Sequence, residues 1–181
     1  MLLEPIVTPL PGLVLLKPVT QFDSRGSFTK VFHASTFAAL GLNTGFTESY
    51  YSTSSAGVLR GMHLQLPPHD HAKLVYVTAG RVLDVVVDLR AGPTYGQHFS
   101  AELSAENRLL LYLPVGFAHG FYVTEGPATM VYLVTKEYAA ASDTGIRWDS
   151  FGFVWPDASP IISARDAGLS MLENFSSPFT L

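Results

Sequence analysis

The chain has 181 residues, a length that suits one domain of generous size or at most two small ones. Hydrophobic residues make up 48% and charged residues 14%, which excludes a disordered or coiled-coil chain and favours a compact β domain with part of its surface buried against another subunit. A formal net charge of -4 without a basic patch excludes a typical nucleic-acid-binding protein, and no window approaches the roughly 20 apolar residues of a membrane-spanning helix.

The N-terminal arm, about residues 1–20, is apolar but interrupted by prolines, a pattern typical of an edge strand or of an arm exchanged between subunits. Glu4 comes early and no basic region is present, so the arm is a poor signal peptide. The chain has no cysteine, and therefore neither a disulfide framework nor thiolate chemistry. We expect a cytoplasmic protein.

A turn at Asp23–Phe28 leads into a strand, and residues 35–41 predict a short helix with Ser35 as its N-cap and Gly41 at its end. Beyond it, short runs rich in Val, Leu, Tyr and Phe alternate with Gly, Pro and Ser turns. Eight strands at this spacing predict a β sandwich or barrel: 46–52, 57–65, 73–79, 81–89, 96–102, 108–113, 119–124 and 128–135. Residues 139–160 read as loop, and the C-terminal segment, about 161–181, has room for a short helix at 161–175.

Two of these strands allow their faces to be assigned, because residues two apart in a strand share a face. In 59–65, a histidine and a glutamine share a face with core-type residues, which predicts a polar pocket inside the barrel; this face is Leu59, Gly61, His63 and Gln65, opposite Arg60, Met62 and Leu64. In 82–88, one face is Leu83, Val85 and Val87, and the other is Val82, Asp84, Val86 and Asp88.

Several residues are able to do acid–base chemistry, although each also has an ordinary structural explanation. A histidine is able to take a proton if its orientation is fixed, so His63 suits a base, but a strand histidine often only makes a hydrogen bond in the core. Lys73 stabilises an oxyanion only if it points into the pocket, and is otherwise a solvated strand end. His119 follows a rigid Pro-x-Gly turn, Tyr132 is ordinarily a core tyrosine, and Asp166 is ordinarily a surface or capping carboxylate.

Other reaction classes have weaker support in the sequence. His69, His71 and His119 match part of a metal-binding cupin pattern, but the glutamate expected after the second histidine is absent and His69 lies beside a Pro-Pro turn. No Gly-x-Ser-x-Gly elbow indicates a serine hydrolase, and no glycine-rich loop indicates a phosphate cradle.

Taken together, the motifs resemble the nucleotide-sugar 3,5-epimerases typified by dTDP-4-dehydrorhamnose 3,5-epimerase. The matching segments lie in the family's order over roughly residues 5–170 and include DSRGSF, GVLRGMHLQ, DVVVDLR, LPVGFAHGF and ISARD. The resemblance implies an all-β fold, a cupin or jelly-roll barrel with short N- and C-terminal helical segments, formed by residues 1–181 as a single domain.

The resemblance also implies a reaction on a nucleoside-diphosphate 4-keto-6-deoxyhexose, inverting C3 and C5 through an enolate. His63 is then the base, Asp166 its carboxylate partner, Lys73 the group facing the O4 anion, and Tyr132 the acid. No metal and no organic cofactor is required, because the ketone of the substrate is the electron sink.

The family pattern further implies a set of substrate-binding residues, with Arg25 and Arg60 on the diphosphate and nucleotide and Asp84 a possible neighbour of His119. The complete set is Arg25, Phe28, Glu48, Tyr50, Arg60, His119, Tyr138 and Arg165. A homodimer is expected in which the N-terminal segment reaches into the partner barrel; no nucleic acid or membrane partner is expected.

The chain departs from the family pattern at positions expected to touch the nucleotide or the edge of the substrate. Lys30 stands where a glutamate is usual, Glu48-Ser49-Tyr50 replaces a Gln-Asp-Asn stretch, and Tyr76 replaces an arginine. The sequence therefore favours dTDP but leaves CDP and GDP open, and inversion at C3 or C5 alone remains an alternative. A metal-dependent cupin enzyme is a more distant alternative.

Overall fold

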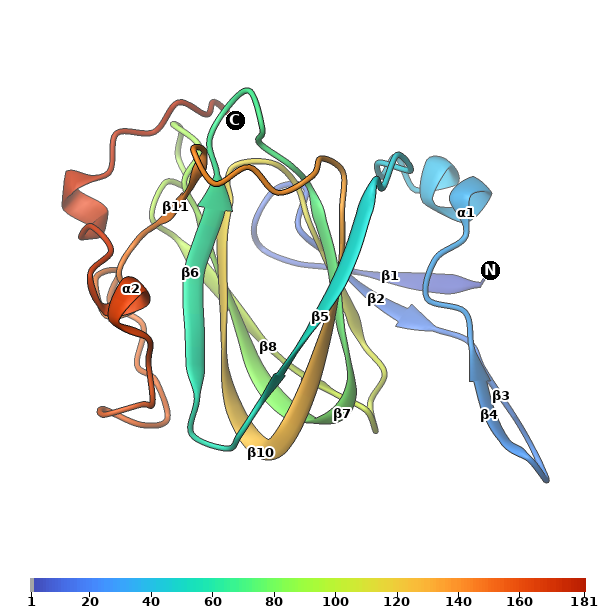
Figure 1. The fold of residues 1–181 in the computed structure, drawn as a ribbon. Helices are drawn as coiled ribbons and strands as arrows, with labels where there is room; N and C mark the ends of the chain where they lie inside the picture. The colour runs from blue at the N-terminus through green and yellow to red at the C-terminus, as the bar shows by residue number, and fades with distance from the viewer. Residues whose placement is uncertain (1) are drawn as a thin grey trace.

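Residues 2–181 are described by a computed structural model in which almost all the regular structure is β (Figure 1). One sheet has nine strands in the order β1-β2-β9-β7-β10-β6-β11, with β5 also pairing with β10 and β8 with β7; β3 and β4 form a separate hairpin. The strands are β1 (Leu3–Val7), β2 (Val14–Pro18), β3 (Thr20–Asp23), β4 (Gly26–Thr29), β5 (Glu48–Ser54), β6 (Leu59–Gln65), β7 (Lys73–Asp88), β8 (His98–Ser104), β9 (Leu110–Leu113), β10 (Phe117–Val134) and β11 (Asp143–Gly145). The helices are α1 (Ala34–Ala39), α2 (Ala164–Ala167) and the 3-10 turn Leu172–Asn174.

Two long strands, β7 and β10, run through both halves of a rolled sheet. The first half of β7 pairs with β9 and with the second half of β10, which in turn pairs with β5. The second half of β7 pairs with β8 and with the first half of β10, which pairs with β6. Two layers that share their central strands, β7 and β10, are the arrangement of a jelly roll, so the predicted cupin fold is confirmed.

The sequence divided β7 and β10 each into two strands, and that division was wrong. Gly80 interrupts the apolar pattern of β7, yet the strand continues through it with a positive φ of 71°. A Cβ at this position would lie 2.5 Å from the carbonyl oxygen of Glu125 in β10, so the glycine is needed where the two strands cross closely. The ladder between β7 and β10 shifts register beside this point, between Val123 and Met130.

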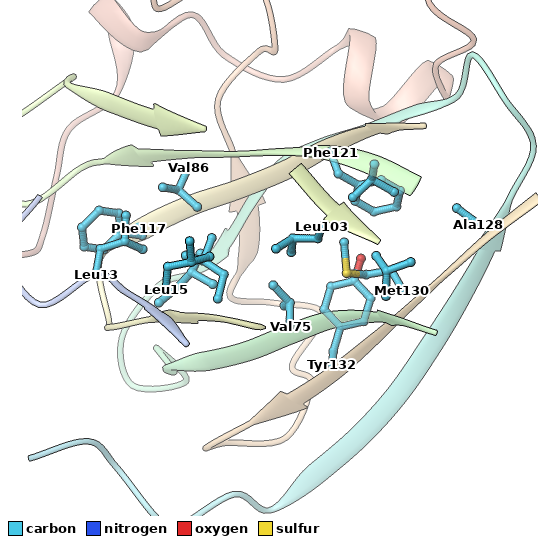
Figure 2. Packing of buried hydrophobic residues seen from close by; sticks show 14 of the residues in the cluster. Leu13, Leu15, Val75, Val86, Leu103, Phe117, Phe121, Ala128, Met130 and Tyr132 are labelled. Carbon is cyan, nitrogen blue, oxygen red and sulfur yellow. The ribbon is translucent and has the colours of Figure 1, made fainter. Parts of the chain in front are cut away.

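The core lies between the two layers, and its side chains come from both (Figure 2). Val82 and Val86 point into it, whereas Val85 and Val87 pack on the outside against Phe151 and Trp155, as the alternation in 82–88 predicted. The C-terminal segment therefore covers the outer face of one layer (Figure 1). Helix α1 covers the other through Phe37, which packs with Leu3, Leu16 and Leu74.

The elements observed near the two ends of the chain match those predicted from the sequence, with local differences. Strand β1 is an edge strand as expected, and the Asp23–Phe28 turn joins β3 and β4. Helix α1 begins after His33 and not after Ser35, which was the predicted N-cap. The terminal helix predicted within 161–175 is two short pieces, and α2 is capped by Ser163, whose Oγ accepts from Asp166 N. No helix within residues 2–181 is long and apolar enough to cross a membrane.

Candidate active site

A cavity of about 390 Å³ opens into the barrel, and strands from both layers line it. Its walls carry many charged and titratable side chains. The lining residues are Glu48, Tyr50, Ser52, Arg60, His63, Leu64, Gln65, His71, Lys73, His119, Gly120, Phe121, Tyr132, Val134, Tyr138, Asp143 and Arg165. The polar pocket predicted from the pattern of 59–65 is therefore present.

His63 on β6 is backed by the buried carboxylate of Asp166. Nε2 of His63 lies 2.8 Å from Oδ1 of Asp166, which is 4% exposed, and Oδ2 of the same carboxylate accepts the N–H of Gly61 at 3.1 Å. Burial by itself would raise the pKa of Asp166, but the hydrogen bonds from His63 and Gly61 and the nearby positive charge outweigh it and lower that pKa. An ionised carboxylate only accepts, so the neutral histidine carries its proton on Nε2 and keeps a free lone pair on Nδ1.

Arg60 also lines this cavity, which contradicts its predicted place on the face opposite His63. The ladder explains the difference: His119 and Phe121 are two apart in β10, whereas their partners His63 and Arg60 are three apart in β6. The extra residue is a β-bulge, which turns Arg60 to the side of His63. Its Nε donates to Ser54 Oγ at 2.8 Å.

Lys73 is the first residue of β7 and its ammonium group is buried. Nζ donates to the backbone carbonyl of His63 at 3.0 Å, so the cation reaches from β7 in one layer to β6 in the other. Burial lowers the pKa of Lys73 to about 8, although the negative charges of Asp143 and Asp84 act in the opposite direction. Near neutral pH the lysine is thus a charged group that has lost most of its water, which suits it to stabilise an anion.

Tyr132 on β10 faces the cavity from the same layer as Lys73, whose cross-strand partner is Val134, and from the layer opposite His63. Burial raises its pKa well above the usual range, so the phenol is fully protonated at neutral pH. Its ring stacks on Tyr50 of β5, with centroids 4.7 Å apart and planes 16° from parallel, because the two residues are direct cross-strand partners. Burial also raises the pKa of Tyr50, to about 12.

A second histidine–carboxylate pair lies deeper in the barrel. His119 Nε2 is 2.8 Å from Oδ2 of Asp84, and both side chains are buried. The other carboxylate oxygen, Oδ1, is buried without a hydrogen-bond partner within residues 2–181. Burial raises the pKa of Asp84, while His119 and Lys73 act to lower it. Asp84 is thus the neighbour of His119 that the sequence suggested.

One ion pair and two hydrogen bonds to carboxylates connect residues that line the cavity. Glu48 accepts the backbone N–H of Tyr138 at 2.6 Å, and Arg165 donates to Asp143 at 2.6 Å. The Tyr138 hydroxyl donates to the same carboxylate oxygen of Asp143 at 3.3 Å. The sequence identified Glu48, Tyr138 and Arg165 but missed Asp143, which lies on β11, a strand too short to show a pattern.

Two expected substrate-binding residues lie outside this cavity. Arg25 and Phe28 belong to the β3–β4 hairpin, which extends away from the barrel (Figure 1). They line a separate surface hollow, where the side chain of Arg25 is 87% exposed and pairs with Asp23, and Phe28 is 64% exposed. The remaining predicted site residues, apart from the buried Asp166 behind His63, lie around the single cavity described above.

The histidines considered as metal ligands do not converge. His69 is exposed, His71 lies 3.0 Å from the amide of Gln65, and His119 pairs with Asp84. Across residues 2–181, no three His, Cys, Asp or Glu side chains are grouped so that they would hold a metal ion.

A cupin barrel whose cavity combines a carboxylate-backed histidine, a buried ammonium group and a protonated phenol has the groups that proton-transferring enzymes use, the isomerases among them. Comparison with known proteins gives the particular family. The family model described as dTDP-4-dehydrorhamnose 3,5-epimerase matches residues 7–174. A dTDP-4-dehydrorhamnose 3,5-epimerase from Shigella flexneri is 39% identical over 165 residues, which are 89% of this chain and 91% of that protein.

Solved structures agree with the sequence comparison. A dTDP-6-deoxy-D-glucose-3,5-epimerase from Legionella pneumophila, in complex with dTDP-4-keto-L-rhamnose, has a TM-score of 0.92 at 35% identity, covering 96% of this chain and 95% of that one. A 3'-monoepimerase from Streptomyces bikiniensis, in complex with dTDP-quinovose, has a TM-score of 0.85 at 32% identity, covering 92% and 88%. The chain belongs to the dTDP-4-dehydrorhamnose 3,5-epimerase family, whose members are isomerases.

Proposed function

We propose that the chain epimerises a dTDP-linked 4-keto-6-deoxyhexose at C3 and C5, converting dTDP-4-dehydro-6-deoxyglucose to dTDP-4-dehydrorhamnose. The observation that carries the proposal is the 2.8 Å contact between His63 and a buried carboxylate at the wall of a cavity that also holds Lys73 and Tyr132. The relative from Legionella pneumophila binds a dTDP-linked keto sugar, which supports dTDP over the other nucleotides.

The first half of the reaction is proton removal. Nδ1 of His63 takes a proton from the carbon next to the C4 ketone, and the electron pair of the C–H bond moves into an enolate whose charge lies on O4. Asp166 stabilises the imidazolium that forms, because its carboxylate accepts the Nε2–H. The Lys73 ammonium faces the O4 anion and stabilises it.

The second half is protonation on the opposite face of the sugar. Tyr132 is protonated at neutral pH and stands on the second half of β10, in the layer that does not contain β6, so it gives its proton to the enolate carbon and inverts the centre. Exchange with water returns a proton to the phenolate and removes one from the imidazolium, which completes the cycle. Neither a metal nor an organic cofactor takes part in these steps.

The substrate-binding residues divide into two groups in this proposal. Arg60 and Arg165 lie at the cavity and bind the diphosphate or the sugar, with Glu48, Tyr50, His119 and Tyr138 around them. Arg25 and Phe28 bind the nucleotide in the cavity of a second subunit, since their own hairpin carries them away from the barrel. The expected homodimer, with residues 1–181 as one domain in the cytoplasm, is part of the proposal. Exchange of the 1–20 arm, which the sequence favoured, is not, because β1 pairs with β2 and β2 with β9 of the same chain, which buries Leu3 and Leu16 in its core.

The experiment is solvent-deuterium incorporation at C3 and C5, followed by NMR with the dTDP-, CDP- and GDP-linked 4-keto sugars in turn. We expect exchange at both carbons of the dTDP sugar, and absence of exchange with all three nucleotides would refute the proposal. Because the similar Streptomyces bikiniensis protein is a 3'-monoepimerase, exchange at C3 without C5 would identify the chain as a single-site epimerase. A dimer mass in light scattering is expected alongside.

A further inference from the structure

The side-chain amide of Gln65 has only one possible orientation. One of its atoms accepts the backbone N–H of Ala139 at 2.7 Å, and this atom must be Oε1, because an amide nitrogen does not accept. The other atom faces the carbonyl oxygens of His69 at 2.8 Å and Glu137 at 3.3 Å, so it must be the donor Nε2. Backbone groups of other residues thus decide which terminal atom of the Gln65 amide is oxygen and which is nitrogen.

This orientation fixes the tautomer of His71. Nδ1 of His71 lies 3.0 Å from Gln65 Nε2, a group that only donates. A proton on Nδ1 would point at another N–H, so Nδ1 is unprotonated and the neutral ring carries its hydrogen on Nε2. Nε2 has no hydrogen-bond partner within residues 2–181, and the ring that carries it lines the cavity.

The surroundings of His71 keep the ring neutral. Burial, and then the positive charges of Lys73 and Lys136, lower its pKa to about 3, although Asp70 acts in the opposite direction. Lys136 pairs with Asp70 at 2.8 Å, which weakens the influence of that carboxylate. Throughout the working pH range the cavity therefore meets an uncharged N–H donor here.

His71 and Lys73 also belong together by position. Residues two apart in extended chain share a face, and both side chains line the cavity, while Ala72 between them packs on the outer face of the barrel. A cation and a neutral donor thus stand side by side on one wall. Two donors of this kind fit a carbonyl or hydroxyl oxygen.

We infer that His71 is a substrate-binding residue, held by Gln65 as the Nε2–H tautomer, which donates a hydrogen bond to an oxygen of the bound keto sugar next to Lys73. This inference rests on the proposed function for the identity of the ligand. The tautomer itself is independent of the function and is tested separately.

The first test is NMR of the full-length protein labelled with ¹⁵N-histidine. We expect the His71 resonances, assigned by their loss in His71→Gln, to show the Nε2–H tautomer from pH 6 to 9. The Nε2–H resonance should shift on addition of dTDP-4-dehydro-6-deoxyglucose and stay unchanged with dTDP alone. An Nδ1–H tautomer, or an unchanged resonance with the sugar nucleotide, would overturn the inference.

The second test compares His71→Leu with His71→Gln, because glutamine supplies an amide N–H near the position of Nε2–H and leucine does not. A lost neutral hydrogen bond predicts a kcat/KM about tenfold below wild type for the leucine variant and within about threefold for the glutamine variant. Equal activity of both variants, at wild-type level or below it, would contradict a donor role. Failure of the wild-type chain to exchange protons would instead refute the proposed function.

Discussion

Replacement of Asp166 by asparagine tests the acid–base reasoning most directly. The carboxylate accepts from His63 Nε2 at 2.8 Å and from Gly61 N at 3.1 Å, and one amide group cannot accept both. If the amide oxygen keeps the Gly61 N–H, its NH₂ donates to His63 Nε2 and drives the histidine proton to Nδ1. The atom proposed as the base is then blocked.

The expected loss follows from these contacts. A hydrogen bond to a charged group is worth about 1.5–3 kcal/mol, and a positioned base contributes roughly 10²–10⁴-fold in rate. We therefore expect Asp166→Asn to lower kcat about 10²–10⁴-fold, equivalent to about 3–5 kcal/mol of transition-state stabilisation. The asparagine is nearly isosteric and Ser163 still caps α2, so the fold should be retained.

The assay is the rate of deuterium incorporation into dTDP-4-dehydro-6-deoxyglucose, with Asp149→Asn as the matched control. Asp149 pairs with Arg147 at the surface, where an ion pair is worth only about 0–1 kcal/mol, so the control should exchange at the wild-type rate. If Asp166→Asn also exchanged at that rate, the carboxylate would not support the base and the reasoning would fail.

Three further predictions concern the other walls of the site. Since the pKa of Lys73 is lowered to about 8, the lysine loses its charge as pH rises through 8, and kcat should fall with it. In Lys73→Arg, which stays charged, this alkaline fall should vanish from the pH profile of kcat. If the fall persisted in that variant, it would belong to another group. Tyr132→Phe should still wash deuterium into the substrate but invert it 10²–10⁴-fold more slowly by NMR, and normal inversion would exclude the phenol as the acid. Gly145→Ala should lower the free energy of unfolding by about 1–3 kcal/mol in urea denaturation, because the new Cβ would clash with the carbonyl oxygen of Met62. An unchanged denaturation midpoint would show that β11 shifts to accommodate the methyl group at little cost.

The alternation of polar and apolar residues was enough to predict most of the barrel and one wall of its cavity. His63 and Gln65 were expected on one inward face, and both line the cavity. Arg60 was misplaced because a bulge adds one residue to β6, and nothing in the local pattern marks an added residue. Gly80 was read as a strand end because a glycine inside a strand and a glycine between strands look alike in sequence.

Contacts between distant residues were beyond the reach of pattern analysis. His63 and Asp166 are 103 positions apart, and their pairing was expected only from the family resemblance. Asp143 was missed because it lies on a three-residue strand and because its contact with Arg165 exists only in the folded chain. The role of Gln65 in orienting His71 depends on carbonyl groups from two separate segments, which only the fold brings together.

The sharing of β7 and β10 between the two layers limits how this cavity is able to open. Lys73 and Asp84 lie on one continuous strand, and His119 and Tyr132 lie on the other, so each of the two strands contributes to both layers around the cavity. A hinge motion that separated the two layers would break the backbone hydrogen bonds between those strands. The ladder between β7 and β10 therefore keeps Lys73, Asp84, His119 and Tyr132 at a fixed mutual spacing.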